Sequence, residues 1–77
     1  MRDNGEVSQP RDVRVREESI RLGQFLKLAD LVDNGGEVKP LMVQGLVAVN
    51  GQTETRRGRQ LTKGDVVTLG DQAVRVS

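Results

Sequence analysis

The chain has 77 residues, a formal net charge of +1, and neither Cys nor His. This length suffices for one domain with a single modest core. Without Cys and His, the chain lacks the thiol and the imidazole that most catalytic and metal sites use. We therefore expect no catalytic residue, metal or cofactor. No stretch has the pattern of a signal peptide or the roughly 20 apolar residues of a membrane span, which predicts a cytoplasmic protein without membrane contact.

The N-terminal residues are polar and lack apolar periodicity. This predicts a disordered arm over residues 1–10, followed by a single domain over residues 11–77. Residues 12–17 then alternate between apolar and charged side chains, with Val13 and Val15 on one face. That alternation predicts a short, half-buried strand.

A helical pattern follows, with apolar side chains spaced three and four residues apart. Asn34-Gly35-Gly36 is expected to end this helix, because glycine accepts the left-handed conformation of a C-terminal cap. The predicted buried stripe consists of Leu22, Phe25, Leu26, Ala29 and Val32, widened by Leu28 and Leu31.

A second, shorter helix is predicted over residues 37–44, with Val38, Leu41 and Met42 buried. Pro40 fits only in its first turn, where no intrahelical N–H is required. Gly45 is the expected stop.

After Gly45 the apolar side chains recur at every second residue, as in a strand. Residues 46–49 predict a strand, and Asn50-Gly51 is a strong signal for a hairpin turn. Further strands are predicted over residues 66–69 and 73–76, with Asp65 as a turn residue that accepts a backbone hydrogen bond. The result is an α+β fold in which two helices pack on a small antiparallel sheet, in the order β-α-α-β-β-β.

The positive charge is concentrated in one segment. Residues 39–63 carry five basic side chains against one acid, Glu54, whereas residues 1–38 sum to −2 and residues 64–77 to −1. Charges at strand ends often only solvate an edge. Three arginines in four residues repel one another unless an anion neutralises them, and the guanidinium matches phosphate oxygens. We therefore expect a phosphate-binding surface, which includes Arg56, Arg57 and Arg59.

Phe25 is the single aromatic residue, and its position on the helical stripe predicts that it is buried. Recognition of unpaired bases normally uses exposed aromatics. This favours recognition of backbone and shape, as on folded RNA, with an arginine plane stacking on one exposed base as an option. Neither helix has the polar and basic run suited to the DNA major groove. A different class of function stays open: a protein-interaction module whose arginine loop docks on an acidic partner surface.

The segment "IRLGQFLKLADLVDNGGEVKPLMVQGLVAVNGQTETRRGRQLTKGDVV" resembles the RNA-binding domain named after small-subunit ribosomal protein S4, the alpha-L RNA-binding motif. The resemblance covers about residues 20–69. Its clearest elements are the helix ending in Gly45, the Asn50-Gly51 turn after a strand, and Gly64-Asp65 further on. "LGQFLK" together with "RRGR" resembles small free-standing bacterial proteins that consist of this domain alone.

The resemblance implies a non-enzymatic protein that binds structured RNA, ribosomal or ribosome-associated, with the ribosome as a candidate partner. The sequence does not define the oligomeric state, and a monomer is the favoured expectation. Many family members have Ser-Arg where this chain has Asn34-Gly35, and Pro-Ser where it has Arg57-Gly58. The arginine is thus expected on the loop instead of the helix. Carried over by position, the RNA-binding residues are Arg21, Lys39, Arg56, Arg57 and Arg59, with Lys27 and Lys63 as weaker additions.

Overall fold

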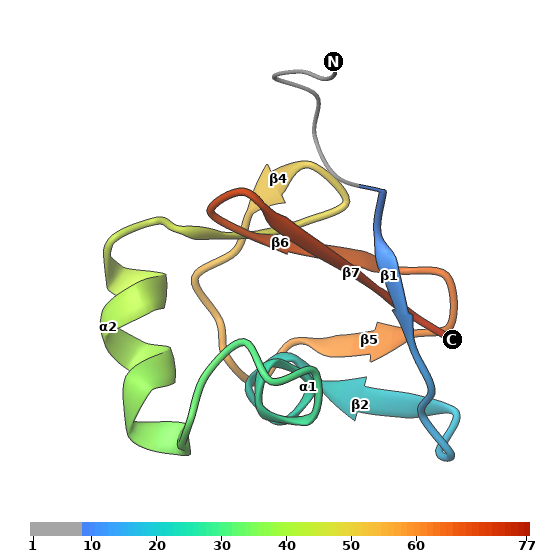
Figure 1. The fold of residues 1–77 in the computed structure, drawn as a ribbon. Helices are drawn as coiled ribbons and strands as arrows, with labels where there is room; N and C mark the ends of the chain where they lie inside the picture. The colour runs from blue at the N-terminus through green and yellow to red at the C-terminus, as the bar shows by residue number, and fades with distance from the viewer. Residues whose placement is uncertain (1–8) are drawn as a thin grey trace.

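The computed structural model describes residues 9–77, which form a five-stranded sheet, a two-stranded ribbon and short helices (Figure 1). Most of the predicted arm falls on residues 1–8, outside the described residues. The predicted α+β class is confirmed. In chain order the elements are β1 (Arg11–Val13), β2 (Ser19–Arg21), α1 (Leu22–Leu28), the 3-10 helix η1 (Gly35–Glu37), α2 (Val38–Val43), β3 (Val47–Val49), β4 (Gln52–Thr53), β5 (Gln60–Thr62), β6 (Val66–Leu69) and β7 (Gln72–Val76).

The larger sheet is mixed, where an antiparallel one was predicted. Its order is β1-β7-β6-β3-β4, and all neighbours are antiparallel except β1, which runs parallel to β7. The strands predicted over residues 66–69 and 73–76 are present, the second beginning one residue earlier. The sequence did not predict β2, β4 and β5, because strands of two or three residues are too short to show alternation.

The first strand is shorter than its apolar pattern. β1 covers Arg11–Val13 and not residues 12–17, yet Val13 and Val15 are both buried as predicted. Beyond β1, the Val15 N–H still donates to the Ser77 carbonyl at 2.8 Å. The alternation therefore predicted which side chains are buried better than it predicted where the strand ends.

The end of α1 differs from the prediction. The helix stops at Leu28, and Asp30 adopts the left-handed conformation with φ 64°. The Asp30 N–H donates to the Lys27 carbonyl and the Leu31 N–H to the Leu26 carbonyl, both at 3.0 Å, which is the Schellman arrangement.

Asn34 begins the next element instead of ending α1. Its side chain accepts a hydrogen bond from the Gly36 N–H at 2.9 Å and caps η1. α2 follows as predicted, with Pro40 in its first turn. It ends in a Schellman motif at Gly45, which has φ 73°.

The hairpin between β3 and β4 turns at Asn50-Gly51, as predicted, with positive φ at both residues. The Asn50 side chain also donates to Asp65 at 3.1 Å and accepts from the Val66 N–H at 2.9 Å. Asp65 accepts from the Thr62 N–H at 2.9 Å, as expected of a turn residue. This bond and that from Asn50 lower the pKa of Asp65 despite its partial burial. The two turns therefore hold one end of the sheet together.

One core lies between the sheet, the helices and the β2–β5 ribbon. The predicted helical stripe is buried at Leu22, Phe25, Leu26, Ala29 and Val32. Leu31 is only partly buried, and Leu28 is 53% exposed because α1 ends there. The buried apolar residues are Val13, Val15, Leu22, Phe25, Leu26, Ala29, Val32, Val38, Met42, Val47, Val49, Leu61, Val67, Ala73, Val74 and Val76.

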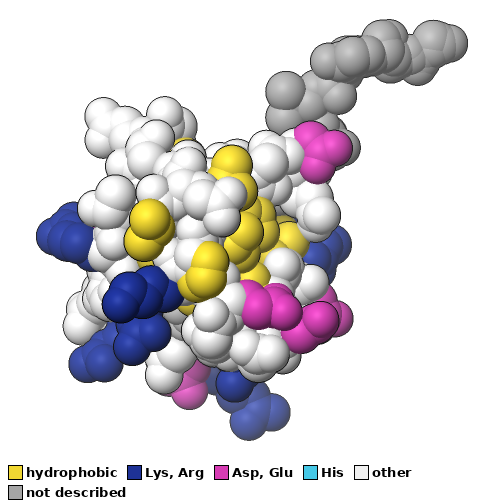
Figure 2. Space-filling view, turned by 90° about the vertical axis from the view of Figure 1, so that its left-hand side faces the viewer, with side chains coloured by type: hydrophobic (Ala, Val, Ile, Leu, Met, Phe, Trp, Pro, Cys, Tyr) yellow, Lys and Arg dark blue, Asp and Glu magenta, His cyan; other side chains and the backbone are white. Residues whose placement is uncertain are grey.

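Some apolar side chains remain at the surface near the end of α2. Val43 is 76% exposed and Leu46 44%. Figure 2 views this side of the molecule and shows apolar side chains next to a group of Lys and Arg side chains. Neither helix within residues 9–77 is long and apolar enough to cross a bilayer. In the same residues, no cluster of three acidic side chains could hold a metal ion.

Candidate nucleic-acid interface

The arginine loop, defined as residues 54–59 between β4 and β5, is hydrogen-bonded to the start of α1. The Leu22 N–H donates to the Arg59 carbonyl at 2.8 Å, and the Gly23 N–H donates to the Arg57 carbonyl at 2.9 Å. The first N–H groups of a helix otherwise lack intrahelical partners, and no side chain caps α1. The loop backbone is therefore held in a fixed position against the helix.

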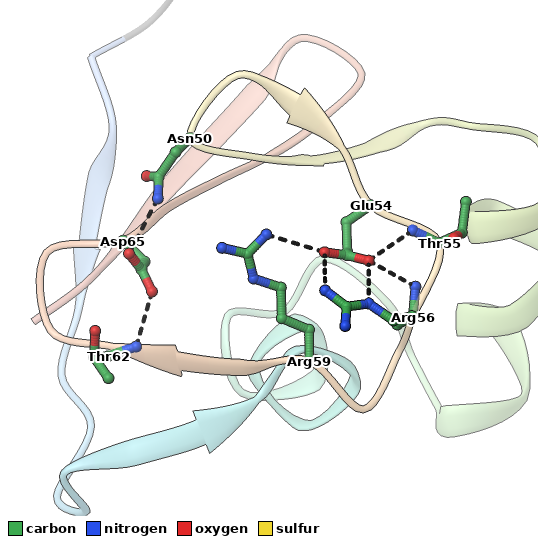
Figure 3. Close-up of polar contacts among 7 residues, drawn as sticks. All are labelled: Asn50, Glu54, Thr55, Arg56, Arg59, Thr62 and Asp65. Carbon is green, nitrogen blue, oxygen red and sulfur yellow. Dashed lines mark hydrogen bonds and ion pairs between the residues drawn. The ribbon is translucent and has the colours of Figure 1, made fainter.

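A buried carboxylate organises the same loop. The Glu54 side chain is only 8% exposed. Its Oε2 accepts from the N–H groups of Thr55 and Arg56, both at 3.0 Å, and from Arg56 Nε at 3.1 Å (Figure 3). Its Oε1 accepts from Arg59 Nη1 at 3.0 Å. These bonds, those from Arg56 above all, lower the pKa of Glu54 to about 2, although burial acts in the opposite direction.

Two of the three clustered arginines thus share one carboxylate as their internal counter-ion, so the loop keeps a net charge of +2. Arg59 is 31% exposed, and Arg56, although 74% exposed, bonds Glu54 through both its backbone and its guanidinium. Arg57 is exposed and makes no ion pair within residues 9–77. Glu54 therefore offsets part of the repulsion expected of this cluster, and Arg57 is the arginine of the loop whose guanidinium has no carboxylate partner among the described residues.

Arg57 lies between two shallow hollows, which together form a surface that we call the cationic groove. The first hollow, of about 300 Å³, is formed by the start of α1, η1, α2 and the loop, and includes Arg21 and Lys27. The second, of about 340 Å³, is formed by α2 and the loop, and includes Lys39. The four cations of the groove are exposed and form no ion pair with any other described residue.

Lys63 lies elsewhere. β2 pairs with β5 so that Arg21 is opposite Gln60 and Ser19 is opposite Thr62, which places Lys63 at the far end of the ribbon from Arg21. The Lys63 ammonium donates to the carbonyl of Val15. With Arg14 and Arg16 it lines a separate hollow. The structure therefore brings Arg21, Lys27, Lys39 and Arg57 together along the groove. Arg56 and Arg59 belong to the same loop but line neither hollow, and Lys63 is not part of the groove.

Two residues of this surface, Glu54 and Gln24, were not predicted from the sequence. Glu54 is the single acid among residues 39–63 and directly precedes the arginines. That position could have indicated an internal counter-ion. Gln24, on the first turn of α1, lines the first hollow. Nothing in its sequence context distinguishes it from an ordinary exposed helical residue.

Comparisons with known proteins agree with this architecture. The family model of the S4 domain matches residues 13–77. The probable ribosome maturation protein RlbA of Bacillus subtilis (strain 168) is 46% identical over 57 residues, which cover 74% of this chain and 80% of that protein. The crystal structure of 30S ribosomal protein S4e from Thermoplasma acidophilum has a TM-score of 0.59 at 23% identity over 78% of this chain. The chain spans 32% of S4e, and at that identity the likeness concerns the fold alone.

Proposed function

Because the chain belongs to the S4 domain family, we propose that it is a non-enzymatic protein that binds structured RNA through the cationic groove. Ribosomal RNA is the first expected target, because the similar protein from Bacillus subtilis carries a ribosome maturation name. The observation that carries the proposal is the gathering of four cations from α1, α2 and the loop around Arg57.

The groove suits the phosphate backbone of a folded RNA. A guanidinium offers a planar set of donors to phosphate oxygens, and lysines act as point charges. The backbone bonds between the loop and α1 hold Arg57 near Arg21 and Lys27 before RNA arrives. Little conformational freedom of the backbone is then lost on binding, which favours affinity. The sole aromatic side chain, Phe25, is buried, so stacking of successive bases on aromatic rings does not contribute.

Salt dependence tests the proposed function. Four phosphate contacts predict a slope of log K against log salt of about −4 on a duplex, because each contact releases condensed counterions. Fluorescence anisotropy with a labelled structured RNA and a DNA duplex of matched length would measure this slope between about 50 and 200 mM salt. We expect tighter binding to the RNA than to the DNA. Equal affinity for both, or binding that does not change with salt, would contradict the proposal.

A further inference from the structure

The first hollow of the groove has a shape and lining that phosphate binding does not explain. Its volume of about 300 Å³ is at the lower end of the range for small-molecule sites, about 300 to 1,000 Å³. Its wall is mainly apolar and includes the Val38 side chain and the backbone of three glycines, Gly23, Gly35 and Gly58. The uncharged Gln24 side chain also lines it. Cations line this hollow as well, but they belong to the long side chains of Arg21, Lys27 and Arg57.

We propose that this hollow accepts one unstacked base of the bound RNA, such as a bulged or looped-out nucleotide. The inference rests on the proposed function and adds to it the structural feature of the RNA that is recognised. The flat face of a base can lie against the glycine backbone, where no side chain projects into the hollow, with the buried Val38 beneath it. Its edge carries donors and acceptors, which match the amide of Gln24. The phosphates on either side of the base would meet Arg21, Lys27 and Arg57.

The stacking partner for this base is an arginine. Proteins stack splayed-out bases on aromatic rings or on guanidinium planes. Phe25 is fully buried, so the aromatic option is absent from this surface. Arg57 is exposed and lines the hollow, and within residues 9–77 no carboxylate pairs with it. The planar face of its guanidinium is therefore available to cover a base that has entered, while the N–H groups at the edge of the plane still reach a neighbouring phosphate.

Gly23 gives a way to fill the hollow without disturbing the fold. An added Cβ at Gly23 would lie 3.5 Å from the Arg57 carbonyl oxygen and 3.8 Å from Val38 Cγ1, which are ordinary contact distances. Gly23→Ala keeps the N–H that bonds the loop, and alanine is the better helix former, so this variant should be at least as stable as the wild type. Gly23→Leu extends further into the hollow. All four groove cations are retained in both variants.

The test uses three RNA hairpins that differ at one position. The first has a single bulged 2-aminopurine, the second an abasic bulge, and the third no bulge. We expect the wild type to bind the first at least about fivefold more tightly than the other two, the lower end of what stacking of one base contributes. The 2-aminopurine fluorescence should change on binding, free of protein background because the chain has no Trp or Tyr.

The variants separate base insertion from phosphate binding. Gly23→Leu, which fills the hollow, should bind the three hairpins with affinities within about twofold of one another, whereas Gln24→Leu, which removes the edge contact and leaves Arg57 to stack, should keep part of the preference. The salt slope should be unchanged in both variants because the phosphate contacts remain. Gly23→Ala serves as the folding control, because its stability shows that a side chain at this position is compatible with the fold. Equal wild-type binding to all three hairpins with a steep salt slope would overturn base insertion and leave the proposed function intact. Failure to bind any hairpin would overturn both.

Discussion

Replacing Arg57 and Lys39 together by glutamine is expected to lower the affinity for structured RNA about fiftyfold near 0.1 M salt. Each phosphate contact contributes a factor of about seven to eight at 0.1 M relative to 1 M salt, because the slope is about 0.9 per contact, and the factors for two contacts multiply to roughly fiftyfold. The slope of the logarithm of the binding constant against the logarithm of the salt concentration should become less steep by about 2, because two phosphate contacts are lost. Both side chains are exposed and form no ion pair within residues 9–77, so stability should change by less than about 0.5 kcal/mol. Fluorescence anisotropy across a salt series measures both quantities.

The matched control is the double variant Arg14→Gln, Arg16→Gln. It changes the net charge by the same two units, but at the separate hollow that contains Lys63. If RNA is held by the groove, this variant should lose no more than about threefold in affinity, because only the long-range electrostatic attraction of the whole protein is weakened. Similar losses in the two double variants would mean that net charge, and not the groove, determines binding.

Arg56 and Arg59 should behave differently from Arg57 although they are close neighbours in the sequence. Their guanidinium groups already bond Glu54, so a phosphate would compete with that carboxylate. In the sequence the three arginines are equivalent, because no local pattern shows how the loop folds back on Glu54. The pairs span two and five residues along an irregular loop, which no helical or strand period predicts.

Turn residues in the sequence correctly predicted where one helix ends and where one hairpin turns. Gly45 ends α2 and Asn50-Gly51 forms the hairpin, because both positions require positive φ. Asn34-Gly35-Gly36 offered the same signal but does not end α1. Asp30 takes the left-handed position four residues earlier, and Asn34 caps η1 instead. Asp adopts this conformation less readily than Gly, so a sequence pattern favours the glycines.

The parallel pairing of β1 with β7 depends on contacts between the two ends of the described chain. It brings Arg11 opposite Val74 and Val13 opposite Val76, pairs separated by more than sixty residues. An alternating pattern predicts that a strand has one buried face but not which neighbour it will have. For the same reason the sequence predicted the cations of the groove but could not show that Lys63 lies at the other end of the ribbon.

Glu54→Gln is expected to lower the free energy of unfolding by about 1–3 kcal/mol at neutral pH. Hydrogen bonds to a charged group contribute about 1.5–3 kcal/mol, and exposure of Arg56 reduces this through solvent screening. The glutamine is isosteric, but its NH₂ group would face a guanidinium donor. The control Asp12→Asn disrupts an exposed ion pair with Arg75 and should cost no more than about 1 kcal/mol. Urea denaturation followed by circular dichroism measures both, since the chain has no Trp.

The pH dependence of this stability difference tests whether the charge of the Glu54 carboxylate is the cause of the destabilisation. The pKa of Glu54 is lowered from 4.5 to about 2 in the folded protein. A lowered pKa contributes stability that is fully present above the unfolded value and is lost as the pH falls through the folded one. The difference between the wild type and Glu54→Gln should therefore be constant from neutral pH down to about 5, and should shrink between about 4.5 and 2. Asp65 titrates in both proteins, so its contribution cancels. A difference that stays unchanged down to the lowest pH would mean that Glu54 acts through its shape and not through its charge.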